Sequence, residues 1–174
     1  WSKTAQARAL SKIIKKEVLT NTQGVKIKKF EIFSPDIAKK AKPGQFVVLM
    51  ISEEGERIPL TIVEKTEKTI TIIFQEIGFT TKLLGNLGEG DSLYAIVGPL
   101  GHATEIRNYG KVILVGGGVG IAEIYPVAKA FKLSGNRVVT IVGARTKDIL
   151  VLGKELKAVS DEFFVATDDG SLGK

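Results

Sequence analysis

The sequence predicts two domains, an antiparallel β-barrel followed by an α/β domain with a parallel sheet that is incomplete at its C-terminus. Before residue 104, short runs rich in β-branched residues are separated by Gly, Pro and charged turns. After it, apolar strands alternate with helices. The first pattern is typical of antiparallel folds and the second of α/β folds. We expect the barrel at residues 12–103, the α/β domain at residues 104–174, and a tail or cloning remnant at residues 1–11.

The barrel half contains six expected strands and one helix. Residues 25–28 alternate apolar and charged side chains, so one face of that strand is buried and the other meets water. Short strands at regular spacing favour a small barrel. The helix is capped by Thr80 or Thr81 and stopped at Gly88. The strands are Lys12–Val18, Val25–Phe33, Gln45–Ile51, Ile58–Glu64, Thr69–Gln75 and Ser92–Val97.

The second half repeats strand and helix, and its strands are almost wholly apolar. Such strands indicate a parallel sheet covered on both faces. Open parallel sheets usually have about five or six strands, and the exposed edges of a smaller sheet favour a missing C-terminal part over a naturally small domain. The expected strands are Lys111–Val115, Val138–Val142 and Phe163–Ala166, and the helices Ile121–Leu133 and Ile149–Val159.

Composition removes several classes of function. The 174 residues include no cysteine and one histidine, which excludes thiolate metal centres and leaves little for a histidine-dependent catalytic triad. The net charge is +6, but half of the excess lies in residues 1–12, so nucleic-acid binding is not expected. No apolar run can span a bilayer and no secretory signal is visible, so the expected location is the cytoplasm, without a membrane partner.

The most informative motif joins an expected strand to an expected helix. It contains Gly116, Gly117, Gly118, Val119 and Gly120. Glycine lets the backbone approach a phosphate, and the helix that follows offers free N–H groups and a partial positive charge. The spacing differs from G-x-G-x-x-G, but the strand–turn–helix context favours a dinucleotide. The alternative is a tight turn that needs glycine only for packing.

Two more segments end strands at the same expected edge, where parallel sheets bind ligands. Asp168 and Asp169 follow Thr167. Two carboxylates would repel a 2′-phosphate and accept hydrogen bonds from ribose, which favours NAD(H) over NADP(H). Gly143 and Arg145 close the neighbouring strand, and Arg145 could hold a pyrophosphate or offset the aspartates. The alternative is a solvated turn with an ordinary charge pair.

Two barrel segments carry related chemistry. Arg57 starts a strand and places a cation four residues before the hydroxyl of Thr61. Another strand leads through Gly78 into the helix capped by Thr80 or Thr81, a second helix start suited to an anion. Read alone, each segment is more often structural than functional.

Together these motifs resemble the ferredoxin–NADP reductase superfamily, in which a flavin-binding barrel precedes a nicotinamide-binding α/β domain. Residues 42–46 (Lys-Pro-Gly-Gln-Phe), residues 98–101 (Gly-Pro-Leu-Gly) and the glycine run occur in the family's order. Residues 56–61 and 166–171 are most similar to the small (alpha) subunits of NADH-dependent ferredoxin:NADP oxidoreductases, also called sulfide dehydrogenase alpha subunits. The electron-transfer subunit of dihydroorotate dehydrogenase is similar. The resemblance covers about residues 12–174.

The resemblance implies that FAD lies against the barrel and that NADH delivers hydride to flavin N5. Thr61 then takes the place of the serine in the family's R-x-Y-S motif, near N5, and Leu60 the place of the tyrosine, with Pro59 before it. The arginine is displaced to Arg57, which a strand points to its other face, so contact between Arg57 and the FAD pyrophosphate is an open question. The other residues that the resemblance places at FAD are Ile73, Phe74, Gln75, Gly78, Thr80 and Thr81.

The sequence also departs from the family at two other places. Glu123 stands where relatives commonly have proline. Relatives carry a C-terminal cysteine cluster that binds a 2Fe–2S centre, whereas this sequence has no cysteine. The centre then lies beyond residue 174, or electrons leave FAD by another route.

The expected function is therefore that of a flavin-dependent oxidoreductase subunit. It would pass hydride between NAD(H) and FAD, and electrons onward to a larger iron–sulfur flavoprotein subunit in a heterodimer or higher assembly, with ferredoxin as an indirect partner. No side chain needs to act as an acid or base, and no metal ligands are expected in this chain. The alternatives are a dihydroorotate dehydrogenase electron-transfer subunit and a non-catalytic nucleotide-binding module.

Overall fold

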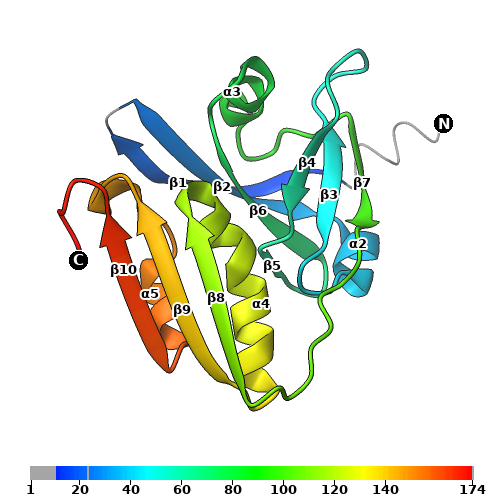
Figure 1. Ribbon diagram of the computed structural model, residues 1–174. Helices are drawn as coiled ribbons and strands as arrows, with labels where there is room; N and C mark the ends of the chain where they lie inside the picture. Colours follow the sequence, from blue (N-terminus) through cyan, green and yellow to red (C-terminus); the bar gives the residue numbers. More distant parts are fainter. Residues whose placement is uncertain (1–10, 23, 174) are drawn as a thin grey trace. The chain divides into compact units, whose positions relative to one another are not determined.

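The computed structural model describes residues 11–22 and 24–173 (Figure 1). The chain divides into two compact units, one ending at His102 and the other beginning at Ala103. We call them the barrel unit and the α/β unit. Residues 101–110 contain no helix or strand. The expected tail, apart from residue 11, lies outside the described residues.

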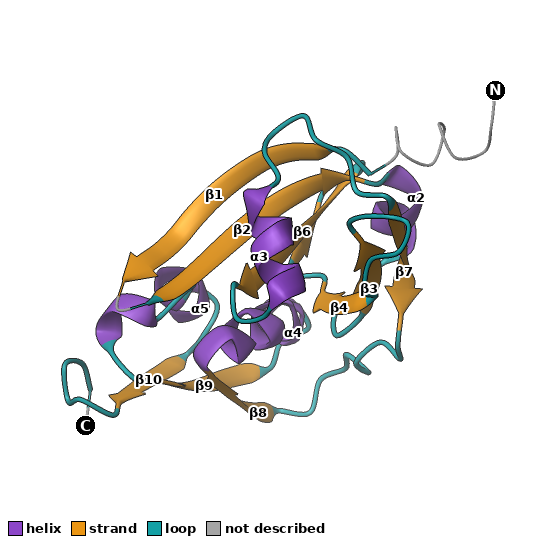
Figure 2. Cartoon of the chain, turned by 90° about the horizontal axis from the view of Figure 1, so that it is seen from above, coloured by secondary structure: helices purple, strands orange, loops and turns teal. Residues whose placement is uncertain are grey.

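Within residues 11–22 and 24–102, the barrel unit contains two antiparallel sheets and two helices (Figures 1 and 2). The elements are β1 (Ile13–Thr22), β2 (Val25–Phe33), α2 (Pro35–Lys40), β3 (Phe46–Met50), β4 (Ile58–Thr61), β5 (Glu64–Lys65), β6 (Thr69–Gln75), α3 (Phe79–Asn86) and β7 (Ala95–Leu100). One sheet has the order β1-β2-β6-β5 and the other β4-β3-β7.

Backbone hydrogen bonds join the two sheets on both sides. On one side, Ile13 N donates to Asp91 O (2.8 Å) and Leu93 N donates to Ser11 O (3.1 Å), just before the chain enters β7. On the other side, the chain passes from β4 to β5, and Val63 N donates to Thr71 O (2.8 Å). The strands therefore form a closed antiparallel barrel, which confirms the predicted fold of this half.

The barrel is held together by a core of aliphatic and aromatic side chains. Phe30 on β2 and Phe74 on β6 are buried and meet edge to face, with ring centroids 5.1 Å apart. Burial of one such side chain stabilises the fold by about 1.5–3 kcal/mol. Ile58 and Leu60 pack against the same core from β4. The ring of Phe74 therefore lies in the barrel interior, where it packs against Phe30.

The α/β unit contains the predicted parallel sheet, whose strands have the order β10-β9-β8. Its elements are β8 (Lys111–Gly117), a 3-10 turn (Gly118–Gly120), α4 (Ile121–Leu133), β9 (Arg137–Ala144), a 3-10 turn (Lys147–Ile149), α5 (Gly153–Ala158) and β10 (Glu162–Thr167). The Asp161 carboxylate accepts hydrogen bonds from Lys132 Nζ (2.6 Å) and Val138 N (2.8 Å), so it joins the end of α4 to the start of β9.

The helices of this unit cover only one face of its sheet (Figures 1 and 2). Val138 and Val142 are buried on the covered face. Strand alternation sends Ile113, Val115 and Phe164 to the opposite face, where they are 61%, 68% and 51% exposed. The expectation of a sheet covered on both faces is therefore wrong for the described residues, because neither α4 nor α5 reaches these side chains.

Several predicted element boundaries also need correction. Helix α2 was not expected, although Pro35 sits at its first turn, a position that proline favours. The last barrel strand spans Ala95–Leu100, and Ser92 makes only an isolated bridge with Lys12. Helix α5 begins at Gly153, four residues later than expected, because Leu152 adopts a left-handed conformation (φ 55°) that an α-helix cannot include.

Candidate functional site

The start of α3 leaves backbone amides free for a ligand. Thr81 Oγ1 accepts hydrogen bonds from the amides of Ile77 and Gly78 (both 3.0 Å) and donates to Gly78 O (3.1 Å), so Thr81, not Thr80, is the capping threonine. Lys82 N donates to Gly78 O (3.1 Å). The amides of residues 79–81 belong to the first turn, which has no carbonyl one turn earlier. They form a site suited to an anion.

An anionic group of the protein already lies at this turn. The Thr80 side chain is 7% exposed, and its hydroxyl donates a hydrogen bond to the Glu56 carboxylate. A Cβ added to Gly78 would meet nothing within 4 Å, so the backbone in front of the helix is open. The geometry therefore supports the prediction of an anion site here, and it adds Glu56, which sequence reasoning missed.

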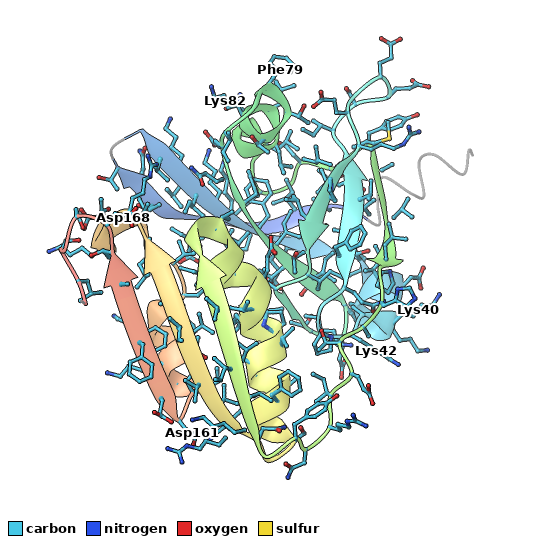
Figure 3. The ribbon with its side chains drawn as sticks, viewed as in Figure 1. Lys40, Lys42, Phe79, Lys82, Asp161 and Asp168 are labelled. Carbon is cyan, nitrogen blue, oxygen red and sulfur yellow. The ribbon has the colours of Figure 1, made fainter. Side chains whose placement is uncertain are left out.

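Exposed apolar side chains flank the same helix start. Phe79 is 78% exposed and Ile77 70%. Figure 3 shows Phe79 and Lys82 projecting from α3. An aromatic surface and a cation beside free amides suit a ligand that carries both a phosphate and a ring. The only local signal for Phe79 in the sequence is its position directly after Gly78.

The other end of α3 is fixed by two lysines. Lys16 Nζ, on β1, donates to Gly85 O (2.8 Å) and Leu87 O (2.7 Å), and Lys28 Nζ, on β2, donates to Gly85 O (2.8 Å). Lys28 also pairs with the Glu76 carboxylate. Burial lowers the pKa of the Lys16 ammonium, and the charge of Lys28 lowers it further. Cations at the C-terminal end of a helix complement its dipole, so the barrel anchors α3 by the end away from the anion site.

Strand β4 distributes its predicted site residues between two faces. Leu60 packs against the barrel core with Ile58. Pro59 and Thr61 alternate to the opposite face, and Arg57, immediately before the strand, is exposed. Arg57, Pro59 and Thr61 therefore have the orientation to meet a ligand together, while Leu60 faces the core. The roles of these four residues at a flavin stay predictions.

Strand β6 offers a backbone edge, whereas two of its side chains are buried. Ile73 and Phe74 are buried, and Gln75 is partly exposed. These residues pair with β2 on one side. On the other side β5 pairs only with Ile70 and Thr71, so within the described residues no strand pairs with Ile73–Gln75 there. A ligand beside this segment would meet backbone groups that no neighbouring strand uses, apart from Gln75 O, which accepts a hydrogen bond from Ile77 N (3.0 Å).

The parallel sheet brings the other predicted segments to one edge. Gly117 pairs with Gly143, and Gly143 also lies beside Ala166. Thr167 pairs with Ala144. The glycine run, the segment ending at Arg145 and the aspartate turn thus all lie at the C-terminal ends of their strands, where parallel sheets bind ligands.

The glycines of the run have different structural reasons. A Cβ at Gly116 would lie 2.9 Å from Ile124 Cδ1 and 3.2 Å from Ile121 Cα, so Gly116 permits close packing of α4. Gly118 has φ +56°, which favours glycine. Gly120 has ordinary helical angles (φ −62°, ψ −14°), and a Cβ there would meet nothing within 4 Å. Packing explains Gly116, backbone conformation explains Gly118, and neither explains Gly120.

The two aspartates after β10 differ in their hydrogen bonding. Asp169 Oδ1 accepts hydrogen bonds from Ser171 Oγ (2.6 Å) and Ser171 N (3.0 Å), and these bonds lower the pKa of Asp169. Asp168 is exposed and lies at the C-terminal end of β10, opposite Asp161 at the other end (Figure 3). In the described part of the chain, Arg145 pairs with neither aspartate. Asp168 is therefore the carboxylate available to a ligand.

The donor set fits dinucleotide phosphates but no metal centre. Each unit has an open helix start with exposed polar groups near it. The chain has no cysteine for a 2Fe–2S centre. Among residues 11–22 and 24–173, no group of three or more His, Cys, Asp or Glu side chains is placed to hold a metal ion. No helix in the described ranges has both the length and the apolar character needed to cross a membrane.

Comparisons with known proteins agree with this fold and with the motifs. The dihydroorotate dehydrogenase B (NAD(+)) electron transfer subunit homolog of Thermotoga maritima is 48% identical over 167 residues, which are 95% of this chain and 57% of that protein. A structure of NADH-dependent reduced ferredoxin-NADP oxidoreductase matches with a TM-score of 0.86 and 46% identity over 94% of this chain and 58% of the other. The chain belongs to the ferredoxin–NADP reductase superfamily.

More distant members share the fold alone. A ferredoxin-NADP+ reductase mutant from Plasmodium falciparum matches with a TM-score of 0.74 at 15% identity, over 90% of this chain and 68% of the other. No model of a known protein family matches the sequence. The chain spans somewhat more than half the length of the curated superfamily relatives that it matches.

Proposed function

We propose that this chain is the cofactor-binding part of an electron-transfer subunit, which passes hydride between NAD(H) and FAD. In this proposal residues 12–103 bind FAD and residues 104–174 bind NAD(H). One observation carries it: each unit has a strand-to-helix turn with open space beside a glycine, at Gly78 and at Gly120, where the protein leaves room for a phosphate next to the backbone. The electron-transfer relatives support it independently.

The barrel unit would hold FAD through three groups of contacts. The amides of residues 79–81, fixed by the Thr81 cap, would bind the pyrophosphate. The open edge of Ile73–Gln75 would hydrogen-bond along the flavin and adenosine. The Thr61 hydroxyl, on the face shared with Arg57, would lie near flavin N5.

The α/β unit would hold the nicotinamide dinucleotide at its glycine turn. The glycine turn before α4 would bind the pyrophosphate, and the missing side chain at Gly120 would let it approach the start of the helix. Asp168 would accept hydrogen bonds from a ribose and repel a 2′-phosphate, which favours NADH over NADPH. Arg145, which is exposed at the same edge, would bind the pyrophosphate through its guanidinium group.

The chain's own part in the reaction is positioning. FAD, when bound, supplies the redox chemistry by accepting a hydride from NADH. The residues assigned above hold and orient the two cofactors, and no side chain must gain or lose a proton, in keeping with one histidine and no cysteine.

Electrons would leave through a partner. The residues of this chain do not fit a 2Fe–2S centre, so we derive no step through one. The relatives named as electron-transfer subunits support a larger partner subunit, for which we propose an iron–sulfur flavoprotein, with ferredoxin served indirectly. A cytoplasmic location stays a prediction.

Titration with FAD, followed by anaerobic addition of NADH, tests the proposal. We expect the protein to bind FAD, and we expect NADH to bleach the visible absorbance of the bound flavin. Gly78→Ala should weaken FAD binding without loss of thermal stability, since a Cβ there meets no protein atom. Failure to bind FAD would refute the proposal. Binding of FAD without bleaching would leave a non-catalytic nucleotide-binding module.

A second candidate acceptor follows from the Thermotoga maritima relative, whose name refers to dihydroorotate dehydrogenase B. In that case the electrons would reach a dihydroorotate-oxidising partner. Steady-state NADH oxidation with each purified partner distinguishes the candidates, because only the physiological partner should accelerate flavin reoxidation. The cofactor sites are the same in both cases.

A further inference from the structure

The Glu56 carboxylate reaches the anion site from a loop remote in sequence. Glu56 lies between β3 and β4, in the exposed segment 52–57, and accepts a hydrogen bond from Thr80, twenty-four residues further along the chain. Thr80 is buried, and its hydroxyl is oriented by this hydrogen bond. This contact holds a negative charge beside the first turn of α3.

A carboxylate at that position has the chemistry of a bound phosphate oxygen. It carries negative charge, accepts a hydrogen bond from a hydroxyl at the helix start, and is favoured by the positive end of the helix dipole. A pyrophosphate bound to the amides of residues 79–81 would compete with the Glu56 carboxylate for the positive end of the helix dipole, and the carboxylate would repel it. Each of the two anions therefore excludes the other from the helix start or weakens its binding there.

The loop can release Glu56 without disrupting the barrel. The last pair between β3 and β4 joins Leu49 to Ile58, so segment 52–57 lies outside the ladder. Its internal backbone hydrogen bond, from Gly55 N to Ser52 O (3.1 Å), closes a local turn that does not involve Glu56. Exchange of the Thr80 contact for a ligand contact requires only a loop movement.

We propose that Glu56 is an internal ligand of the α3 anion site, which the pyrophosphate of FAD must displace, so that Glu56 limits the affinity for FAD. This inference rests on the proposed function, because it takes FAD as the competing anion. In this proposal Glu56 weakens dinucleotide binding, independently of any contact that the neighbouring Arg57 makes.

The test compares Glu56→Gln with Glu54→Gln in the full chain. Both substitutions remove one negative charge from the same exposed loop, but only Glu56 contacts Thr80. Quenching of flavin fluorescence gives the Kd for FAD. We expect Glu56→Gln to bind FAD at least tenfold more tightly than wild type, and Glu54→Gln to stay within about twofold. The inhibition constant of inorganic pyrophosphate against FAD should also be lower in Glu56→Gln than in wild type.

Other outcomes overturn the inference. Equal affinities of the two variants would make Glu56 a bystander, and weaker binding by Glu56→Gln would make it part of the FAD site. Glu56→Ala, with thermal unfolding as a check on folding, repeats the test without an amide side chain. If neither wild type nor Glu56→Gln binds FAD, the proposed function fails with the inference. If wild type binds FAD and Glu56→Gln gains nothing, only the inference fails.

Discussion

Gly120→Ala should stabilise the protein and weaken its binding of NADH. Gly120 has helical angles, and a Cβ there meets no protein atom within 4 Å. Alanine is therefore tolerated in the folded state and restricts the unfolded chain, which stabilises a protein by about 0.4–1 kcal/mol. For a chain of this size, that corresponds to a rise in Tm of about 1–4 °C.

Gly120→Ala should weaken the binding of NADH, although it stabilises the fold. If the missing side chain admits a pyrophosphate, a methyl group in its path should raise the Kd for NADH at least tenfold, or about 1.4 kcal/mol. Calorimetric melting without nucleotide and isothermal titration with NADH measure the two effects. Gly116→Ala is the contrasting variant, because its Cβ would collide with α4 and should destabilise the fold by about 1–3 kcal/mol. Unchanged NADH affinity in Gly120→Ala would refute the reasoning and leave a purely structural turn.

Three more predictions concern the α/β unit. Asp168→Asn should reduce the preference for NADH over NADPH about tenfold, measured as the ratio of the two Kd values, since a hydrogen bond to a charged group contributes about 1.5–3 kcal/mol. Asp169→Asn should leave this ratio unchanged, because the Asp169 carboxylate is held within its own turn. The hydrogen bond from Lys132 lowers the pKa of Asp161 below its ordinary 3.8, so its stabilisation exists above pH 3.8 and disappears as pH falls through the lowered pKa. Asp161→Asn should therefore lower Tm at pH 7, and this loss should shrink as the pH falls below 3.8, as followed by circular dichroism. A loss that stays the same down to low pH would contradict this. Val115→Thr should reduce binding of an apolar dye while Tm stays within about 2 °C, because the side chain is 68% exposed.

Local patterns predicted most of the fold because side-chain periodicity reflects burial directly. The alternation in residues 25–28 identified an antiparallel strand, and the apolar run at residues 111–115 identified a parallel one, although the run did not reveal that one face of β8 is exposed. Short elements were harder. Helix α2 has six residues, too few for a periodic pattern, and the start of α5 depends on the left-handed conformation of Leu152, an unusual choice for leucine.

The candidate site was predictable where one segment builds it. The glycine run and Thr81 act through their own backbone and neighbouring residues, so their pattern carries the information. Glu56 does not, because its contact with Thr80 arises from barrel closure between distant segments. The different hydrogen bonding of Asp168 and Asp169 was also hidden, since it depends on the exact turn that Ser171 makes.

Packing of the fold favours glycine at Gly116 but not at Gly120, and this difference has a consequence for descendants of this gene. A lineage that stopped binding nucleotides would still favour glycine at position 116, since a Cβ there would lie 3.2 Å from Ile121 Cα and crowd α4 against β8. It would be free to drift at Gly120, where the fold itself imposes no restriction. Natural variation at these two positions can therefore tell lineages that retain cofactor chemistry from those that keep only the scaffold.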